Sequence, residues 1–256
     1  MGQYLPEISS VIAQAFANSI SNAVGDGINE DVLSKGLITQ NGNPGRIWDI
    51  LHTDLANSLD PACVVAKPSR RGAWKILPVF DKQTGILFCC MREKNFSLLC
   101  HRNLAKQKRH YLFALSKAFN NDLPSLQVRL DVFQDNNNND DSDLVKVAIA
   151  RITDDLGIPA NIIERHALIL FHAVDNQLLT LRCCAINGMF EIVDSINWDE
   201  FIPDISSAIV DTVEDDMEKS QAYKPKLKLK EKAKSRIDRK SSIAIHQEEE
   251  ENKNLD

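Results

Sequence analysis

The stretch that decides the fold is Ala73-Trp-Lys-Ile-Leu-Pro-Val-Phe-Asp-Lys-Gln-Thr-Gly-Ile-Leu-Phe-Cys-Cys-Met-Arg-Glu-Lys-Asn95. It predicts two strands joined by a tight turn at Asp81–Gly85, because turn-forming residues there separate two apolar runs. Even-numbered and odd-numbered positions of these runs are both apolar. That pattern is typical of a sheet that is covered on both faces. The 73–95 hairpin is therefore expected to lie at the centre of the fold.

Helices are expected before this hairpin. Apolar residues recur at helical spacing over about 6–23 and 44–59, and a shorter helix is predicted over about 30–35. Asn43 and Pro44 form a cap followed by proline at the first helical position. These segments predict an N-terminal helical layer.

The second half of the chain alternates between helical and strand patterns. Phe96–Cys100 is expected to extend the hairpin's second strand or to start a third. Helices are predicted over about 102–120, 142–156 and 206–219, and strands over about 126–133, 167–174, 178–186 and 189–196. Asn187-Gly188 is a strong hairpin signal, so the last three strands predict an antiparallel meander.

The predicted fold class is α+β. It has an N-terminal helical layer, a central mixed sheet built on the buried hairpin, a C-terminal antiparallel meander and a disordered charged tail. The predicted segments are 1–134 (helical layer and mixed sheet), 135–141 (an Asn/Asp loop), 142–222 (helix and meander) and 223–256 (the tail). The sequence leaves open whether the two folded segments share one sheet.

The net charge of −6 conceals an uneven distribution. Residues 224–240 carry +7 and residues 241–256 carry −4, which leaves −9 on residues 1–223. An acidic body argues against binding nucleic acid through the folded surface. Contact with nucleic acid is therefore expected, if at all, through the basic tail at 224–240.

Several classes of protein are disfavoured. No apolar run reaches the roughly 18 residues of a transmembrane helix, and the N-terminus lacks the pattern of a signal peptide. A cytoplasmic location without membrane contact is therefore expected. The six cysteines lie in apolar runs and are interpreted as reduced core residues. Common nucleotide-binding and hydrolase motifs are absent, so no cofactor, metal ligand or catalytic residue is assigned.

A candidate site follows from the hairpin's register. If Phe80 pairs near Ile86, then Arg92 lies near Trp74 and Glu93 lies near Ala73. Charged side chains then gather at the hairpin's open end, where they would form a pocket for an anion or an acidic partner. The alternative is a solvated strand end. The predicted binding residues are Arg70, Arg71, Trp74, Arg92, Glu93, Lys94 and His110. His110 comes from a basic segment over 101–110, which is interpreted as an ordinary exposed face; the alternative is a face that meets phosphate or an acidic partner.

The order of elements over 44–133 resembles the core of restriction-type nucleases. That resemblance implies an acidic residue followed by Glu-x-Lys on two adjacent strands, for which Asp81, Glu93 and Lys94 are the candidates. However, adjacent residues on a strand point to opposite faces, so Glu93 and Lys94 would diverge. The hairpin also separates Asp81 from Glu93 by roughly 25 Å, which excludes a shared metal ion.

A second resemblance rests on four short motifs between about 45 and 120. They are Arg46-x-Trp48-Asp49, Gly72-Ala73-Trp74-x-x-x-Pro78-x-x-Asp81, Met91-Arg92-Glu93-x-x-Phe96 and His110-Tyr111-Leu112. Together they resemble an uncharacterised bacterial family of unknown function. The resemblance implies no activity and no site residues.

The preferred functional hypothesis is a non-enzymatic cytosolic module that binds another macromolecule, most readily a protein. A component of a bacterial defence or toxin–antitoxin operon fits the acidic body and the charged tail. The alternative is a nuclease-like or nucleotide-acting enzyme that uses the charged end of the 73–95 hairpin.

Overall fold

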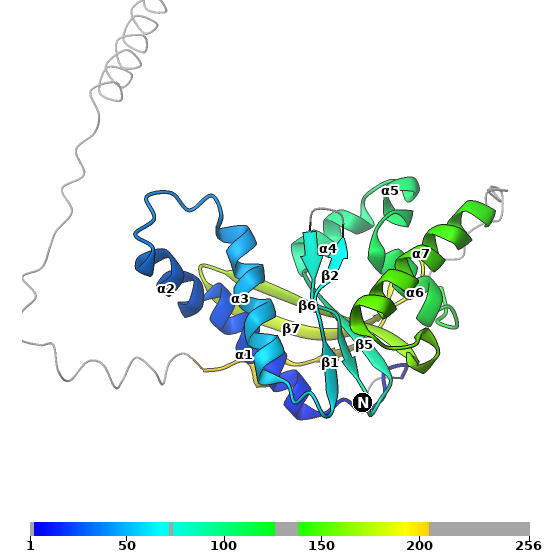
Figure 1. Cartoon of the computed structure of the whole chain (residues 1–256), viewed down its shortest axis with the longest axis horizontal. Helices are drawn as coiled ribbons and strands as arrows, with labels where there is room; N and C mark the ends of the chain where they lie inside the picture. The colour runs from blue at the N-terminus through cyan, green and yellow to red at the C-terminus, as the bar shows by residue number, and fades with distance from the viewer. Residues whose placement is uncertain (1–2, 72–73, 126–137, 205–256) are drawn as a thin grey trace, which may run out of the picture. The chain divides into compact units, whose positions relative to one another are not determined.

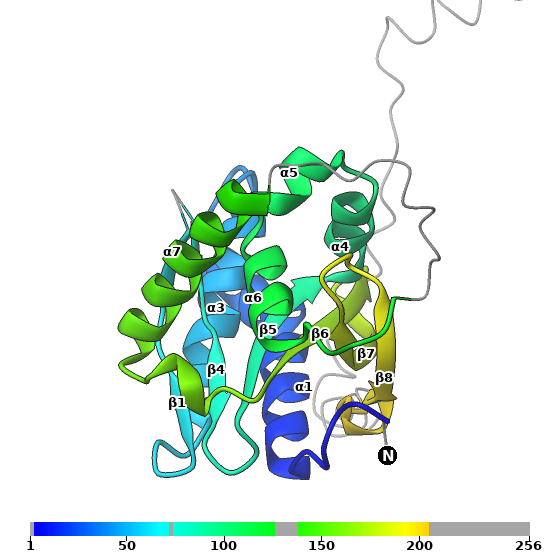
Figure 2. The ribbon, with the colours of Figure 1, turned by 90° about the vertical axis from the view of Figure 1, so that its right-hand side faces the viewer.

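Strand β5 (Ile86–Arg92) lies within a six-stranded mixed sheet of order β1-β4-β5-β6-β7-β8. The computed structural model describes residues 3–71, 74–125 and 138–204, and α1 and α3 lie on one face of the sheet while α6 and α7 lie on the other (Figures 1 and 2). This arrangement confirms the predicted α+β class, with an N-terminal helical layer, a central mixed sheet and a C-terminal meander.

The helices precede, interrupt and follow the strands. The α-helices are α1 (Ser10–Val24), α2 (Asp26–Ser34), α3 (Asn43–Ser58), α4 (Glu93–Cys100), α5 (Leu104–Lys108), α6 (Tyr111–Phe119) and α7 (Asn138–Leu156). Short 3-10 turns are η2 (Ala160–Ile162) and η3 (Asp199–Phe201). The other strands are β1 (Val64–Ala66), β2 (Ser69–Arg71), β3 (Trp74–Ile76), β4 (Val79–Asp81), β6 (Arg165–Val174), β7 (Gln177–Ile186) and β8 (Ile192–Asn197).

The turn between β4 and β5 is the one expected from the sequence. Phe80 pairs with Leu87, one residue from the predicted register, and Gly85 adopts φ +69°. Asp81 is buried, and its carboxylate accepts hydrogen bonds from Gln83 N and Thr84 Oγ1 at 3.1 and 2.6 Å. The carboxylate of Asp81 therefore stabilises the turn between β4 and β5.

The first predicted strand of this hairpin is wrong in one respect. Trp74–Ile76 pairs with β2 in a separate two-stranded sheet, and Arg71, not Arg92, lies opposite Trp74. The chain leaves strand geometry at Leu77 and Pro78, where the missing N–H of proline removes a hydrogen-bond donor. The hairpin is therefore split between two sheets.

The second predicted strand is also shorter than expected. β5 ends at Arg92 and α4 begins at Glu93, so the prediction of a strand over Phe96–Cys100 is wrong. Phe96 and Leu99 are buried at helical spacing. A run this short and apolar fits both the helical and the strand periodicity, so tertiary packing decides between helix and strand.

Both halves of the chain contribute to the large sheet. β5 pairs in parallel with β6, from Ile86 opposite Arg165 to Arg92 opposite Phe171. β6, β7 and β8 then pair antiparallel in order, as the sequence predicted. The question of one sheet or two is thus answered, while the segment boundaries at 134 and 142 stay predictions.

The central strands of the sheet are buried on both faces, because alternate side chains along each strand enter two different hydrophobic cores. Phe88 packs with Phe16 and Leu51 under α1 and α3. Leu87 packs with Leu112 and Ile152 under α6 and α7. The all-apolar pattern of β5 is thereby explained.

The remaining predictions differ in outcome. The helix expected over 102–120 is two helices, α5 and α6, and α7 begins earlier than expected. The strand expected over 126–133, the helix over 206–219 and the charged tail lie outside the described residues. Among the residues that are described, no helix has the length and apolar character needed to cross a membrane.

Asn120, at the C-terminal cap of α6, joins two strands of the sheet. Its side-chain amide donates to the carbonyls of His166 and Ile186 at 2.9 and 2.8 Å, and its side-chain oxygen accepts from His166 N at 3.0 Å. All three bonds are buried. The ends of β6 and β7 depend on this side chain for their backbone hydrogen bonds.

We expect Asn120→Ala to destabilise the protein by about 3 kcal/mol or more, because each buried polar group that is left unpaired costs about 1–3 kcal/mol. Urea unfolding measures the change, and Asn121→Ala at the exposed neighbouring position is the matched control. Equal stabilities of the two variants would contradict this role.

Candidate functional site

The β2–β3 hairpin presents two different faces. Arg71 lies opposite Trp74 and Arg70 lies opposite Lys75. Because side chains alternate along a strand, Arg71 and Trp74 share one face while Arg70 and Lys75 share the other. The face of Arg71 also carries Ser69, whose buried hydroxyl donates to Asp155 Oδ2 on α7 at 2.6 Å. This bond holds the hairpin against α7.

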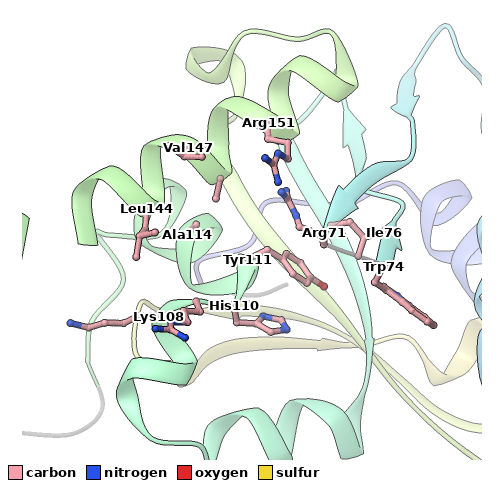
Figure 3. A pocket seen from close by; sticks show the side chains of 12 residues that line it. Arg71, Trp74, Ile76, Lys108, His110, Tyr111, Ala114, Leu144, Val147 and Arg151 are labelled. Carbon is pink, nitrogen blue, oxygen red and sulfur yellow. The ribbon is translucent and has the colours of Figure 1, made fainter. Parts of the chain in front are cut away.

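A cavity of 620 Å³ lies between this hairpin, α7 and the junction of α5 with α6, and we call it the basic cleft (Figure 3). Among the described residues, its lining includes four cationic side chains, His110 and the aromatic rings of Trp74 and Tyr111, but no acidic residue. It is lined by Arg71, Trp74, Ile76, Lys108, Arg109, His110, Tyr111, Ala114, Leu144, Val147, Ala148 and Arg151.

Arg71 is the most constrained of these cations. Its guanidinium carbon lies 5.7 Å from the centre of the Tyr111 ring, a cation–π distance. Its Nε and Nη2 atoms are buried and meet no acceptor within the described residues. Burial is the main cause that lowers the pKa of Arg71, and the nearby Arg151 cation acts in the same direction while Asp155 opposes it. The positive charge of the cleft is thus incompletely balanced.

His110 is a neutral hydrogen-bonding group at the same site. Its Nδ1 caps α6 by accepting from Leu112 N at 3.3 Å, and its ring lies 4.6 Å from the Tyr111 ring centre to centre. Burial, with the Arg102 and Arg71 cations, lowers the pKa of His110 to about 4. Since Nδ1 accepts, Nε2 carries the proton and can donate it in a hydrogen bond.

A second cavity of 340 Å³ adjoins the basic cleft and shares Trp74, Ile76, His110 and Tyr111 with it. We call it the aromatic cavity, since five of its described lining side chains are aromatic rings. The remaining lining residues are Pro44, Trp48, His52, Leu77, Cys89, Cys90, Met91 and Asn95. Burial lowers the pKa of His52 to about 4, so this ring is also neutral at pH 7.

The structure brings Arg71, Trp74 and His110 of the predicted site residues together on the basic cleft. Arg70 lies on the other hairpin face, and its backbone N–H points to Asp155 Oδ2 at 3.4 Å. The other three occupy the end of β5 and the start of α4. Arg92 lies over the Phe171 ring at 5.8 Å, Glu93 forms an ion pair with Arg182, and Lys94 is exposed.

Arg151 and Tyr111 are the main cleft residues that sequence reasoning did not single out. Arg151 follows Leu144, Val147 and Ala148 at helical spacing. This second stripe of α7 is visible in the sequence, but only the packing of the β2–β3 hairpin beside α7 places it on the cleft.

The nuclease-type arrangement is not formed by its candidates. Asp81 lies at the turn end of β5, whereas Glu93 and Lys94 follow the opposite end and begin a helix. Within the described ranges, no group of three or more His, Cys, Asp or Glu side chains is placed to hold a metal ion.

Comparison with known families places this geometry in context. A family model described as a family of unknown function (DUF5986) matches residues 5–247. The chain belongs to this family. The match confirms the resemblance to an uncharacterised family and extends it well beyond residues 45–120, while a bacterial origin stays a prediction. No curated protein and no solved structure matches the chain.

In this DUF5986 chain, we expect His110 to make stability depend on pH. Its pKa is about 4 when folded and 6.5 when unfolded, so the unfolded state takes up the proton first as the pH falls. The free energy of unfolding should therefore decline between pH 6.5 and pH 4.

The substitution His110→Asn retains a capping side chain but cannot titrate. Urea unfolding at pH 7 and pH 5 should show a loss smaller by about 2 kcal/mol in the variant than in the wild type. A residual loss is expected from His52 and His166, whose pKa values are lowered to about 4 and about 3. Identical losses in the two proteins would contradict the assignment.

Proposed function

We propose that the protein is a non-enzymatic binding module that holds an anionic segment of another macromolecule in the basic cleft. The observation that carries the proposal is the set of Arg71, Arg109 and Arg151 on a cleft whose described lining residues include no carboxylate. No ion-pair partner of these three lies within the described part of the chain.

The free-energy cost of gathering these cations in one cleft supports this proposal. Like charges that share a cleft repel one another, and the buried N–H groups of Arg71 lose their hydration without gaining an acceptor among the described residues. An anion in the cleft would relieve both costs. Arrangements that oppose folding in this way are commonly retained for binding.

Charge and rigidity support it further. Arg71 is fixed by the hairpin and by the Tyr111 ring, so little side-chain entropy is lost when it binds. Guanidinium groups are suited to carboxylate and phosphate because they can donate two parallel hydrogen bonds.

The wider hypotheses stay predictions of the sequence. These are a cytoplasmic location, a bacterial source, a role in defence or toxin–antitoxin systems, a protein as partner, and nucleic-acid contact through residues 224–240. The enzyme alternative, a nuclease-like or nucleotide-acting protein that uses the end of the 73–95 hairpin, also stays a prediction.

We expect the double substitution Arg71→Gln/Arg151→Gln in the full chain to weaken binding of an anionic polymer by about tenfold or more. Fluorescence anisotropy measures this with two labelled probes, a short single-stranded oligonucleotide and an oligoglutamate peptide. At least one probe should bind the wild type and weaken with added salt.

The control is Lys75→Gln/Lys94→Gln, which removes the same charge from exposed positions that do not line the cleft. It should bind like the wild type. If neither probe binds, or if the two double variants lose affinity equally, the proposal is wrong. Equal losses would point to the overall charge and not to the cleft.

A further inference from the structure

The basic cleft and the aromatic cavity form two chemically different compartments around one shared wall. Trp74 and Tyr111 belong to both. The arginines lie on the basic side, whereas Trp48 and His52 lie only on the aromatic side. A ligand that contacts both compartments must therefore combine a negative group with an apolar, planar one.

The aromatic cavity is suited to a flat ring. Trp48 and His52 have ring centres 5.6 Å apart on α3, and Trp74 is 49% exposed although it is a large apolar side chain. Aromatic rings stack favourably on nucleobases, and do so with little dependence on which base is present. A volume of 340 Å³ lies within the usual range for small-molecule pockets.

The basic cleft is suited to phosphate. Arg71 and Arg151 both line it, and their guanidinium groups face the same space (Figure 3). His110, neutral and with Nδ1 used for capping, offers a further donor at the junction of the compartments. Guanidinium groups beside aromatic rings are a common combination in proteins that bind single-stranded nucleic acids.

From this juxtaposition we infer that the cleft binds a nucleoside phosphate, with the base against Trp74 in the aromatic cavity and the phosphate between Arg71 and Arg151. This inference rests on the proposed function and names its ligand chemistry. The unit comes either from a single-stranded nucleic acid or from a free nucleotide. An acidic peptide would pair with the arginines, but it would place no planar group in the aromatic cavity.

The inference also revises an expectation drawn from composition. Residues 1–223 carry −9, which argues against nucleic-acid binding by the folded body. The local charge of the cleft is nevertheless positive, because the described residues of its lining include Arg71, Arg109 and Arg151 but no Asp or Glu. Within a Debye length of about 8 Å, this local charge dominates over distant ones.

The experiment compares ligands that differ only by the base. The full chain is titrated with a short single-stranded oligonucleotide, with an abasic phosphodiester oligomer of equal charge, with a nucleoside monophosphate and with ribose 5-phosphate. Fluorescence anisotropy follows the labelled oligomers, and calorimetry follows the small ligands. The base-bearing member of at least one pair should bind about tenfold more tightly than its abasic partner.

Two substitutions locate the effect. Trp74→Ala should abolish the preference for the base, while Leu33→Ala, at an exposed apolar position on α2 that lines neither cavity, should leave it unchanged. Arg71→Gln/Arg151→Gln should weaken both members of a pair. Tight binding of the monophosphate would identify a free nucleotide as the source, whereas a preference confined to the oligonucleotide would identify nucleic acid.

Failure of this inference is distinct from failure of the proposed function. If base-bearing and abasic ligands bind equally, or if Trp74→Ala keeps the preference, the nucleoside phosphate is ruled out. Binding of oligoglutamate that depends on the two arginines would then still support an anion-binding module. If no anionic ligand binds through Arg71 and Arg151, both proposals are wrong.

Discussion

The parallel pairing of β5 with β6 is the constraint on which the rest of the structure depends. Parallel neighbours cannot be joined by a short turn, so the chain must cross over one face of the sheet before it returns. Helices α4 to α7 lie in that crossover. The apolar side chains of β5 are buried on both faces of the sheet, under α1 and α3 on one face and under α6 and α7 on the other.

The crossover also creates the cleft. It places α7 beside the β2–β3 hairpin, where Asp155 accepts the hydroxyl proton of Ser69 in a hydrogen bond. Strand alternation then turns Arg71 and Trp74 toward α6 and α7. The cleft is thus a consequence of one strand pairing and one buried polar contact, and its cations come from segments that are distant in the sequence.

Two polar side chains of this fold, Asn120 and Arg71, differ in how their buried hydrogen-bonding groups are satisfied. Asn120 satisfies three buried backbone groups, as a core that is optimised for stability requires. Arg71, in contrast, lies beside another cation and has two buried donor atoms that meet no acceptor in the part of the chain that the structure describes. The contrast distinguishes a residue that stabilises the chain from one that, in our proposal, binds a ligand.

The sequence by itself determined the elements with strong local signals. The turn at Asp81–Gly85, the helices before it and the β6–β7–β8 meander follow from periodicity and turn chemistry, which act between near neighbours. It also directed attention to Arg71, Trp74 and His110. Only the tertiary structure decided that Pro78 divides the predicted hairpin between two sheets, that Glu93 starts a helix, and that Arg151 joins Arg71 across the cleft. These outcomes depend on packing between segments some 80 residues apart along the chain, and neither residue propensity nor net charge reports on such contacts.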